Sequence, residues 1–274
     1  MSNDQAPALE LAGITCRFAA RDGGEPYTAV ANATLAVAKG EFVSVVGPTG
    51  CGKSTLLNVA AGLLEPSSGS VSVFGERLAA SQGINRRAGY MFQADALMPW
   101  RTGLGNVVAG LEFRGVPPAE AAAKADEWLR RVGLAGFGDR YPHQMSGGMR
   151  KRLALAQTLI LSPDILLMDE PFSALDVQTR QLMENELLAL WAEDRKSVLF
   201  ITHDLEEAIA LSDRVVVLSA GPGTRPIGDF KVELPRPRDV SEIRMTPAFL
   251  DLHREIWGVM KEEVLKAYQR QKAA

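Results

Sequence analysis

The sequence has little cysteine and no excess of positive charge, and both shortages exclude classes of protein. Its 274 residues include two cysteines, Cys16 and Cys51, without CxxC or Cys/His spacing. This excludes a disulfide framework and a zinc site, and it favours a reducing compartment. The net charge of −3 argues against nucleic acid as the main partner, because nucleic-acid-binding domains usually carry a basic excess.

Long hydrophobic runs and internal sequence repeats are also missing. No stretch approaches the roughly 18 uncharged apolar residues of a membrane span, so we expect that the chain does not cross a membrane by itself. The N-terminal stretch MSNDQAPALE has no basic segment followed by an apolar one, and no secretory signal peptide is expected there. The composition, with 46% hydrophobic and 23% charged residues, is that of an ordinary globular protein.

Unbroken apolar runs that alternate with helical stretches predict an α/β fold built around a mainly parallel sheet. Such runs are typical of parallel strands that are buried on both faces. They lie at residues 41–47, 164–169, 197–203 and 214–220. The helices expected among them lie at about 53–64, 177–194 and 204–211.

The first part of the chain has a different pattern. LELAGITCRF and NATLAVAKG alternate partly in hydrophobicity, as half-buried strands do, with an expected loop, AARDGGEPY, between them. SGSVSVFGE also alternates and predicts a peripheral antiparallel strand. Together these segments predict an N-terminal antiparallel β part.

Two further regions complete the predicted organisation. Residues from about 94 to 160 show helical patterns and predict a mostly helical subdomain inserted between strands, and the proline-rich segment after 220 predicts loop with one edge strand. A last helix is expected with Thr246 as N-cap and Pro247 at its first position. The predicted organisation is one main domain over residues 1–235 and a C-terminal helical extension over 236–274. The last helix has an apolar face, which predicts that it docks on the rest of the protein. The residues of this face are Phe249, Leu252, Ile256, Val259, Met260 and Leu265.

The stretch GPTGCGKST at residues 47–55 matches the phosphate-binding pattern G-x-x-x-x-G-K-[ST], between an expected strand and an expected helix. Backbone N–H groups of residues 50–54 would surround a β-phosphate, Lys53 would reach the β- and γ-phosphates, and Ser54 would ligate Mg²⁺. Cys51 is interpreted as a packing residue, and Thr55 is expected at the α-phosphate. The predicted ATP-binding residues of this phosphate loop are Gly47, Pro48, Thr49, Gly50, Cys51, Gly52, Lys53, Ser54 and Thr55.

The stretch ILLMDEP at residues 165–171 ends an expected buried strand with two adjacent acids. Burying two like charges side by side is costly unless a cation neutralises them, and a magnesium-bound nucleotide is the natural candidate. We expect Asp169 to bind Mg²⁺, directly or through water, and Glu170 to accept the proton of the attacking water. The alternative, in which these acids face solvent or cap the next helix, is weakened by the phosphate loop upstream.

A second glycine-rich stretch, MSGGMRKR at residues 145–152, stands at the start of an expected helix. Glycines at a helix start leave backbone N–H groups free, which is typical of phosphate binding. This stretch lacks a following Lys-Ser/Thr pair, and no strand comes shortly before it. The sequence by itself therefore predicts a phosphate contact of a different kind from the first loop.

Taken in order, GPTGCGKST, Gln93, MSGGM, ILLMDEP, SALD (173–176) and His203 resemble the ATP-binding-cassette (ABC) ATPases, the nucleotide-binding subunits of ABC transporters. The resemblance covers residues from about 9 to 220. LMPWRT, YPHQMSGGMRKR and HREIW look most like the nitrate/sulfonate/taurine class of importer. The resemblance implies a P-loop NTPase core and an ATP sandwich, in which two copies meet head to tail with Mg²⁺ as cofactor.

The resemblance also implies roles for single residues. Gln93 would contact Mg²⁺ and the attacking water, and His203 would contact the γ-phosphate and steady Glu170. Phe18 would stack on adenine, with Tyr27 as the alternative. The contacts to the other copy's ATP would come from Ser146, Gly147, Gly148 and Met149, and Asp176 would cross the dimer interface.

The resemblance leaves three departures and several alternatives. Met149 stands where the family more commonly has glutamine. Lys151 and Gln157 stand where arginines are common, and neither of these two residues is expected to contact a catalytic group. The implied partners are a membrane permease, contacted between Gln93 and Arg101, and an extracytoplasmic solute-binding protein, with the chain peripheral on the cytoplasmic face of the membrane. A soluble ABC ATPase acting on nucleic acid or ribosomes is the alternative, and a non-catalytic nucleotide-gated protein is a third. The sequence does not identify the transported solute.

Overall fold

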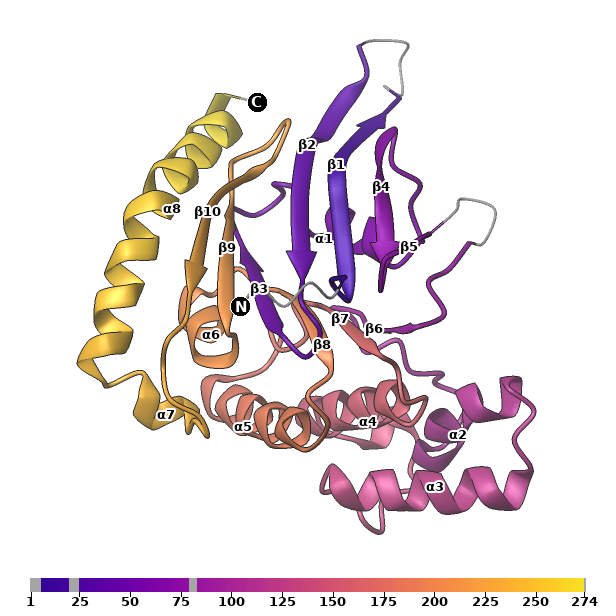
Figure 1. Cartoon of the computed structure of the whole chain (residues 1–274). Helices are drawn as coiled ribbons and strands as arrows, with labels where there is room; N and C mark the ends of the chain where they lie inside the picture. Colours follow the sequence, from indigo (N-terminus) through magenta and orange to yellow (C-terminus); the bar gives the residue numbers. More distant parts are fainter. Residues whose placement is uncertain (1–5, 20–24, 79–82, 274) are drawn as a thin grey trace.

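The computed structural model describes residues 6–19, 25–78 and 83–273, and it arranges them around two β-sheets (Figure 1). The larger sheet has the strand order β10-β9-β3-β8-β7-β6; all neighbouring pairs in it are parallel except β9 with the edge strand β10. Its strands are β3 (Phe42–Val46), β6 (Ala88–Met91), β7 (Ile165–Asp169), β8 (Ser197–Ile201), β9 (Arg214–Leu218) and β10 (Pro226–Lys231). The predicted mainly parallel sheet is confirmed; β6, which was not predicted, is a four-residue strand.

The smaller sheet is antiparallel and has the order β2-β1-β4-β5, as the alternating N-terminal pattern predicted. Its strands are β1 (Leu9–Phe18), β2 (Tyr27–Val37), β4 (Ser68–Val73) and β5 (Glu76–Arg77). The loop expected between the first two strands lies partly outside the described residues, which omit 20–24.

The α-helices are α1 (Lys53–Ala60), α2 (Gly103–Phe113), α3 (Pro118–Arg131), α4 (Gly147–Leu159), α5 (Val177–Asp194), α6 (Leu205–Leu211), α7 (Val240–Ile243) and α8 (Pro247–Ala273). Figure 1 shows α8 along the β10 side of the larger sheet, α5 and α4 below the sheet, and α2 and α3 beyond α4. The helix expected to reach residue 64 ends at Ala60 instead. The chain leaves the helix at Gly62, whose φ of 70° is in the left-handed region that favours glycine after a helix end.

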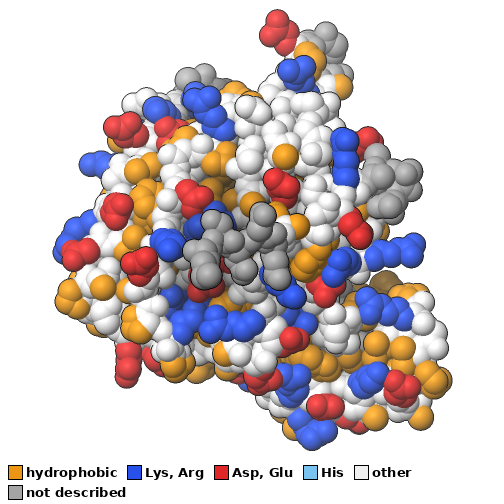
Figure 2. Space-filling model, viewed as in Figure 1, with side chains coloured by type: hydrophobic (Ala, Val, Ile, Leu, Met, Phe, Trp, Pro, Cys, Tyr) orange, Lys and Arg blue, Asp and Glu red, His pale blue; other side chains and the backbone are white. Residues whose placement is uncertain are grey.

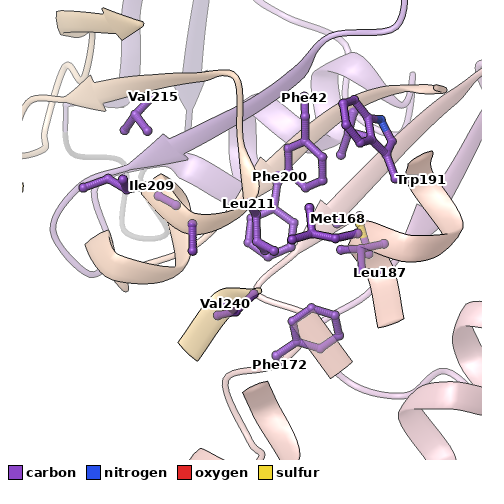
Figure 3. Packing of buried hydrophobic residues seen from close by; sticks show 14 of the residues in the cluster. Phe42, Met168, Phe172, Leu187, Trp191, Phe200, Ile209, Leu211, Val215 and Val240 are labelled. Atoms are coloured by element: carbon purple, nitrogen blue, oxygen red, sulfur yellow. The ribbon is translucent and has the colours of Figure 1, made fainter. Parts of the chain in front are cut away.

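Alternate residues of the central strands pack on opposite faces of the larger sheet. On β8, Val198 and Phe200 pack in a cluster with α4, α5, α6 and α8, while Leu199 and Ile201 pack with α1 and the smaller sheet. Burial on both faces explains why these strands are apolar without alternation. Figure 3 shows Phe42 facing Phe200 from the neighbouring strand, with ring centroids 5.8 Å apart.

The segment between β6 and β7 contains α2, α3, the short 3₁₀ helix Pro142–Gln144 and α4. Buried residues of the three α-helices form a separate cluster that includes Val107, Leu129 and Leu153. This segment is helical, as its sequence pattern predicted, and no strand lies within it among the described residues.

The last helix, α8, begins at Pro247 with Thr246 as its N-cap, as predicted. The Thr246 hydroxyl accepts a hydrogen bond from the Phe249 N–H at 3.4 Å. Phe249, Ile256 and Met260 are buried against the body of the protein. The prediction was wrong for Leu265, which is 50% exposed. Glu263 takes the buried position after Met260, and a residue two positions later points about 200° away around a helix. No helix in the described part of the chain combines the length and apolar character that a membrane span needs.

Candidate functional site

The predicted site segments follow neighbouring parallel strands. The phosphate loop follows β3, Gln93 follows β6, Asp169 ends β7, and His203 follows β8. In the sheet these strands are neighbours, in the order β3-β8-β7-β6. Since the carboxyl ends of parallel strands meet at one edge, ligands of open α/β sheets bind there, and the predicted residues converge at that edge.

The phosphate loop curls around the Lys53 side chain. Gly50 and Gly52 have φ values of 73° and 109°, which glycine adopts without steric cost. The buried Lys53 ammonium donates hydrogen bonds to the carbonyl oxygens of Gly47 at 2.9 Å and Pro48 at 3.1 Å. Helix α1 starts directly after Gly52, so its free N–H groups and Lys53 present positive charge to one place.

Cys51 is a free, buried cysteine within this loop. Burial raises the pKa of its thiol, and the nearby Lys53 charge offsets this only in part. A protonated thiol is a weak nucleophile, which agrees with the interpretation of Cys51 as a packing residue.

Asp169 faces the first turn of α1. Its Oδ1 accepts a hydrogen bond from the Ser54 hydroxyl at 2.9 Å, and its Oδ2 lies 3.5 Å from the Tyr90 hydroxyl. Burial raises the pKa of Asp169, and the Glu170 charge adds to this effect, while the Ser54 hydrogen bond opposes it. Tyr90 was not predicted from the sequence; its hydroxyl donates a hydrogen bond to the side-chain oxygen of Asn58 on α1 at 3.0 Å.

A hydroxyl and a carboxylate side by side form an oxygen donor set that suits Mg²⁺. Within the described ranges there is no cluster of three or more His, Cys, Asp or Glu side chains able to hold a metal ion. A magnesium ion at Ser54 and Asp169 would therefore take its remaining ligands from water and nucleotide phosphates, which is the usual mode of Mg²⁺ binding in ATP-using proteins.

The Glu170 carboxylate lies among polar groups from three different strand ends. Its Oε2 is 2.9 Å from Nδ1 of His203 and accepts a hydrogen bond from Nε2 of Gln93 at 3.4 Å. Its Oε1 is 4.0 Å from the Lys53 ammonium. The three side chains that surround this carboxylate follow β8, β6 and β3. The structure thus brings Gln93, Glu170 and His203 together, as predicted.

The backbone of Glu170 is in an unusual conformation. Its φ of 43° lies in the left-handed region, which is costly for a residue with a side chain. Its N–H donates to the Ile201 carbonyl at 2.9 Å, and its carbonyl accepts from the Ser173 hydroxyl at 3.0 Å. These bonds hold the carboxylate toward His203 and Gln93, and Ser173 was not predicted from the sequence.

Phe18 and Tyr27 pair with each other across the β1–β2 ladder. They are 39% and 48% exposed, respectively. A Cβ atom built on Gly52 would lie 3.3 Å from Cγ2 of Val30, so β2 touches the phosphate loop three residues after Tyr27. The two aromatic candidates therefore lie opposite each other on adjacent strands, and the alternative between them stays open.

The residues expected to act on a second copy cap two helices. The Ser146 hydroxyl accepts from the Met149 N–H at 3.3 Å at the start of α4, and Asp176 accepts from the Thr179 N–H at 3.0 Å at the start of α5. The hydrogen bond from Thr179 lowers the pKa of Asp176. A Cβ on Gly148 would lie 2.7 Å from the Thr179 methyl, so the two helix starts adjoin and a larger residue at 148 would displace Thr179. Ser146, Gly147 and Gly148 are called the SGG loop below.

Two of the departures from the family pattern have structural explanations. The Met149 side chain packs against the helical cluster of α2, α3 and α4. The buried Lys151 ammonium donates to the Gln93 carbonyl at 2.7 Å and pairs with Asp95 at 2.9 Å. The sequence predicted no catalytic contact for Lys151; in the structure its ammonium binds the backbone carbonyl of Gln93, whose side chain is a predicted catalytic group. Asp95, which also pairs with Arg150 at 2.9 Å, was not found by sequence reasoning.

Comparison with known proteins agrees with this geometry. The chain matches the ABC transporter family over residues 30–173. An uncharacterised ABC transporter ATP-binding protein of Methanocaldococcus jannaschii is 47% identical over 244 residues, which cover 89% of this chain and 88% of the relative. The taurine import ATP-binding protein of Mesorhizobium japonicum is 44% identical over 260 residues, which cover 93% of this chain and 98% of the relative.

A solved structure of similar fold is a dimeric ATP-binding cassette in a post-hydrolysis state, bound to ADP and Pi. It superposes with a TM-score of 0.72 at 31% identity and covers 83% of this chain and 100% of that chain.

The fold and the site define a P-loop ATPase of the ATP-binding-cassette class. The chain belongs to the ABC transporter family, in which it is an ATP-binding subunit that couples ATP hydrolysis to transport. The predicted family and fold class are confirmed.

Proposed function

We propose that two copies of this chain enclose ATP between them and drive a separate membrane permease that imports a small solute. The observation that carries the proposal is the Glu170 carboxylate, held among Lys53, Gln93 and His203 at the edge where nucleotide binds. A protein that only binds nucleotide would not need the Glu170 carboxylate next to its phosphate loop. In this proposal residues 1–235 form the ATPase domain and 236–274 a C-terminal extension.

ATP binding would use the phosphate loop. Lys53, which hydrogen-bonds to loop carbonyls here, would turn its ammonium to the β- and γ-phosphates. Ser54 and Asp169 would hold Mg²⁺, together with Gln93. The ion would offset phosphate charge as ATP reacts. The raised pKa of Asp169 supports this assignment, because a cation beside a partly buried carboxylate offsets the cost of its ionisation.

Hydrolysis would depend on Glu170 as the general base. A water molecule between the γ-phosphate and Glu170 would lose a proton to the carboxylate as it attacks phosphorus, and the ADP oxygen would leave. His203 is hydrogen-bonded to Oε2, so it would fix the direction of the carboxylate. Gln93 would orient the same water through its amide.

The SGG loop would complete the site of a second copy. It has the free N–H groups of a helix start but no lysine, and Lys53 of the other copy would supply that charge. Met149 would take part through its backbone N–H, which donates to the Ser146 hydroxyl at 3.3 Å here and would turn to the phosphate. Asp176 would cross the interface nearby. The dimeric cassette with ADP and Pi supports this arrangement by its similarity.

The permease would bind near residues 93–101. Trp100 is 73% exposed there and Phe113, at the end of α2, is 84% exposed. Figure 2 shows hydrophobic side chains gathered over α2 and the adjoining part of α3. Large exposed aromatic side chains are typical of protein interfaces, so this surface suits a membrane subunit. The chain would then lie peripherally on the cytoplasmic face of the membrane.

The solute class that we propose is nitrate-, sulfonate- or taurine-like, delivered by an extracytoplasmic binding protein. Support comes from the similarity to the taurine import protein. The alternative of a soluble ABC ATPase acting on nucleic acid or ribosomes is not favoured, because the net charge is −3 and one of the relatives described above is a taurine import protein.

Co-purification with the permease, followed by uptake assays, tests this proposal. Vesicles that contain the wild-type chain and its permease should accumulate taurine, a sulfonate or nitrate in the presence of ATP and the binding protein. The Glu170→Gln chain is the matched control and should support no uptake. A chain that hydrolyses ATP but associates with no membrane protein would contradict the import function.

A further inference from the structure

The C-terminal helix α8 ends its buried face on an acid. Phe249, Ile256 and Met260 of this face are buried and apolar, and Glu263, one turn further on, is 9% exposed. A buried carboxylate is costly unless hydrogen bonds and opposite charges compensate it. Glu263 therefore needs specific partners that an apolar residue at this position would not need.

Glu263 is bonded to the loop between β9 and β10, residues 219–225, and to a lysine of its own helix. Oε2 of Glu263 accepts a hydrogen bond from the Ala220 N–H at 2.7 Å. Its Oε1 accepts from Lys266 at 2.5 Å, and two turns after Glu263 the Arg270 side chain donates to the Gly221 carbonyl. Burial opposes the charge, but Lys266, the Ala220 N–H and Arg270 together lower the pKa of Glu263, which keeps it ionised.

The other side of the same loop touches the phosphate loop. A Cβ atom built on Gly221 would lie 3.5 Å from Cα of Cys51 and 3.6 Å from the Gly50 carbonyl oxygen, so the Gly221 backbone lies beside the phosphate loop with room for only a methyl group between them. At the start of the phosphate loop, a Cβ on Gly47 would lie 3.1 Å from the Leu218 carbonyl oxygen at the end of β9. The phosphate loop thus rests on the end of β9 and on Gly221.

The second half of the β9–β10 loop has its own anchor. The Thr224 N–H donates to the Ala29 carbonyl at 3.0 Å, and its carbonyl accepts from the Ala31 N–H at 3.0 Å. These bonds tie Thr224 to β2. The half that carries Ala220 and Gly221 lies beside Gly50 and Cys51, and it is held by α8 as well as by the Ser219 N–H, which donates to the Arg225 carbonyl at 2.9 Å.

We propose that Glu263 is a positioning residue for the ATP site. It fixes Ala220 and Gly221 behind Gly50 and Cys51, and so holds the phosphate loop in its binding shape. The inference rests on the proposed function in so far as this loop binds ATP. A loop that is held in shape before binding loses less conformational freedom when ATP arrives, so α8 contributes to ATP affinity from outside the site.

Nucleotide affinity and turnover, measured on the full-length chain, test this role. Glu263→Ala should raise both KM for ATP and Kd for a fluorescent ATP analogue about 5- to 20-fold, with kcat within about twofold of wild type. Glu263→Gln keeps an acceptor for the Ala220 N–H and should recover most of the affinity. Glu262→Ala, at an exposed position of the same helix, should change neither value.

The outcomes separate this role from a purely structural one. If Glu263→Ala lowers Tm but leaves KM and Kd at their wild-type values, Glu263 only stabilises the helix and the inference fails. If that variant does not fold, Arg270→Ala removes the contact to Gly221 near the exposed helix end and should still raise KM about 2- to 5-fold; an unchanged KM would refute the inference. A wild-type chain that neither binds nor hydrolyses ATP would refute the proposed function itself.

Discussion

Arg180 on α5 forms an ion pair with Asp204, the residue after His203, with 3.2 Å between Nη1 and Oδ2. Its Nη2 also donates to the Leu175 carbonyl at 3.2 Å. The side chain therefore joins the segment that leads to Asp176 to the segment that carries His203. His203 contacts Glu170, so in the proposed mechanism Arg180 would connect the dimer interface at Asp176 to the proposed base.

Arg180→Ala should lower kcat for ATP about 3- to 30-fold, because a charge-assisted contact of roughly 1–2 kcal/mol between the two segments is lost. KM for ATP should change less, since Arg180 does not contact the phosphate loop. Steady-state kinetics over a range of ATP concentrations measures both values. Arg130→Ala, at an exposed position of α3, is the control. If the two variants had the same kcat, Arg180 would have no role in turnover.

Glu170→Gln should lower kcat about 10²- to 10⁴-fold, because the amide cannot accept the proton of the attacking water. The amide keeps nearly the same shape, so ATP binding and ATP-dependent dimerisation should persist. Single-turnover hydrolysis and size-exclusion chromatography with Mg²⁺-ATP measure these properties. Normal turnover by this variant would assign the base to another residue.

His203→Ala should reduce kcat about 10- to 100-fold while ATP affinity changes less, because Glu170 loses the hydrogen bond at Oε2 that fixes its direction. The comparison of kcat with the Kd of an ATP analogue checks this prediction. His143, which is exposed in the helical region, offers a matched control as His143→Ala. If the His203 variant turned over at the wild-type rate, the histidine would have a structural role.

Phe18→Ala and Tyr27→Ala distinguish the two candidates for adenine stacking. Loss of a base–aromatic stack of about 1–3 kcal/mol should weaken ATP binding roughly 5- to 100-fold in the variant that removes the stacking ring. The other variant should have a smaller effect, although the two residues pair across β1 and β2. Binding of ATP and of inorganic triphosphate, compared by calorimetry, checks this, because triphosphate binding should be insensitive to either change.

Stability should fall as the pH rises from about 5 to 8.5. Burial raises the pKa of Glu207 from 4.5 to about 8, and burial likewise raises that of Glu184 to about 7. Between the unfolded and the folded pKa, the folded chain holds protons that the unfolded chain has lost, so the free energy of unfolding decreases with pH across this window.

At about 1.4 kcal/mol per pH unit for each group, the expected loss is on the order of 5 kcal/mol, and urea unfolding at pH 5.5 and 8.5 measures it. Glu207→Gln should make the pH dependence much weaker, since Gln does not titrate, whereas Glu262→Gln at an exposed position should leave it unchanged. A pH dependence that is the same in all three proteins would show that Glu207 titrates normally.

Much of the fold followed from local patterns. The unbroken runs of β3, β7, β8 and β9 identified strands buried on both faces, and the expected bounds of α5 were those of the structure. The errors came where local pattern is weak. Strand β6 has four residues, too few for a period, and α1 ends early because Gly62 is left-handed. Leu265 was assigned to the buried face because hydrophobicity alone does not reveal that Glu263 would be buried instead.

The candidate site shows the same division. Lys53, Ser54, Asp169 and Glu170 were found from two stretches of sequence, because each stretch carries its chemistry in consecutive residues. Tyr90, Ser173 and Arg180 were missed, because each is an ordinary polar residue that acquires its contacts only from residues distant in sequence.

The sequence by itself determined the family, the phosphate loop and the pair of acids, because the covalent order of neighbouring residues sets these features. Tertiary structure alone decided what surrounds the Glu170 carboxylate, since the crossover connections of the parallel sheet place β8 between β3 and β7. It also decided that Lys151 holds Gln93 and that Glu263 reaches the loop behind Cys51. These contacts join residues far apart in the chain, and only packing of the completed sheet and helices brings them within hydrogen-bond distance.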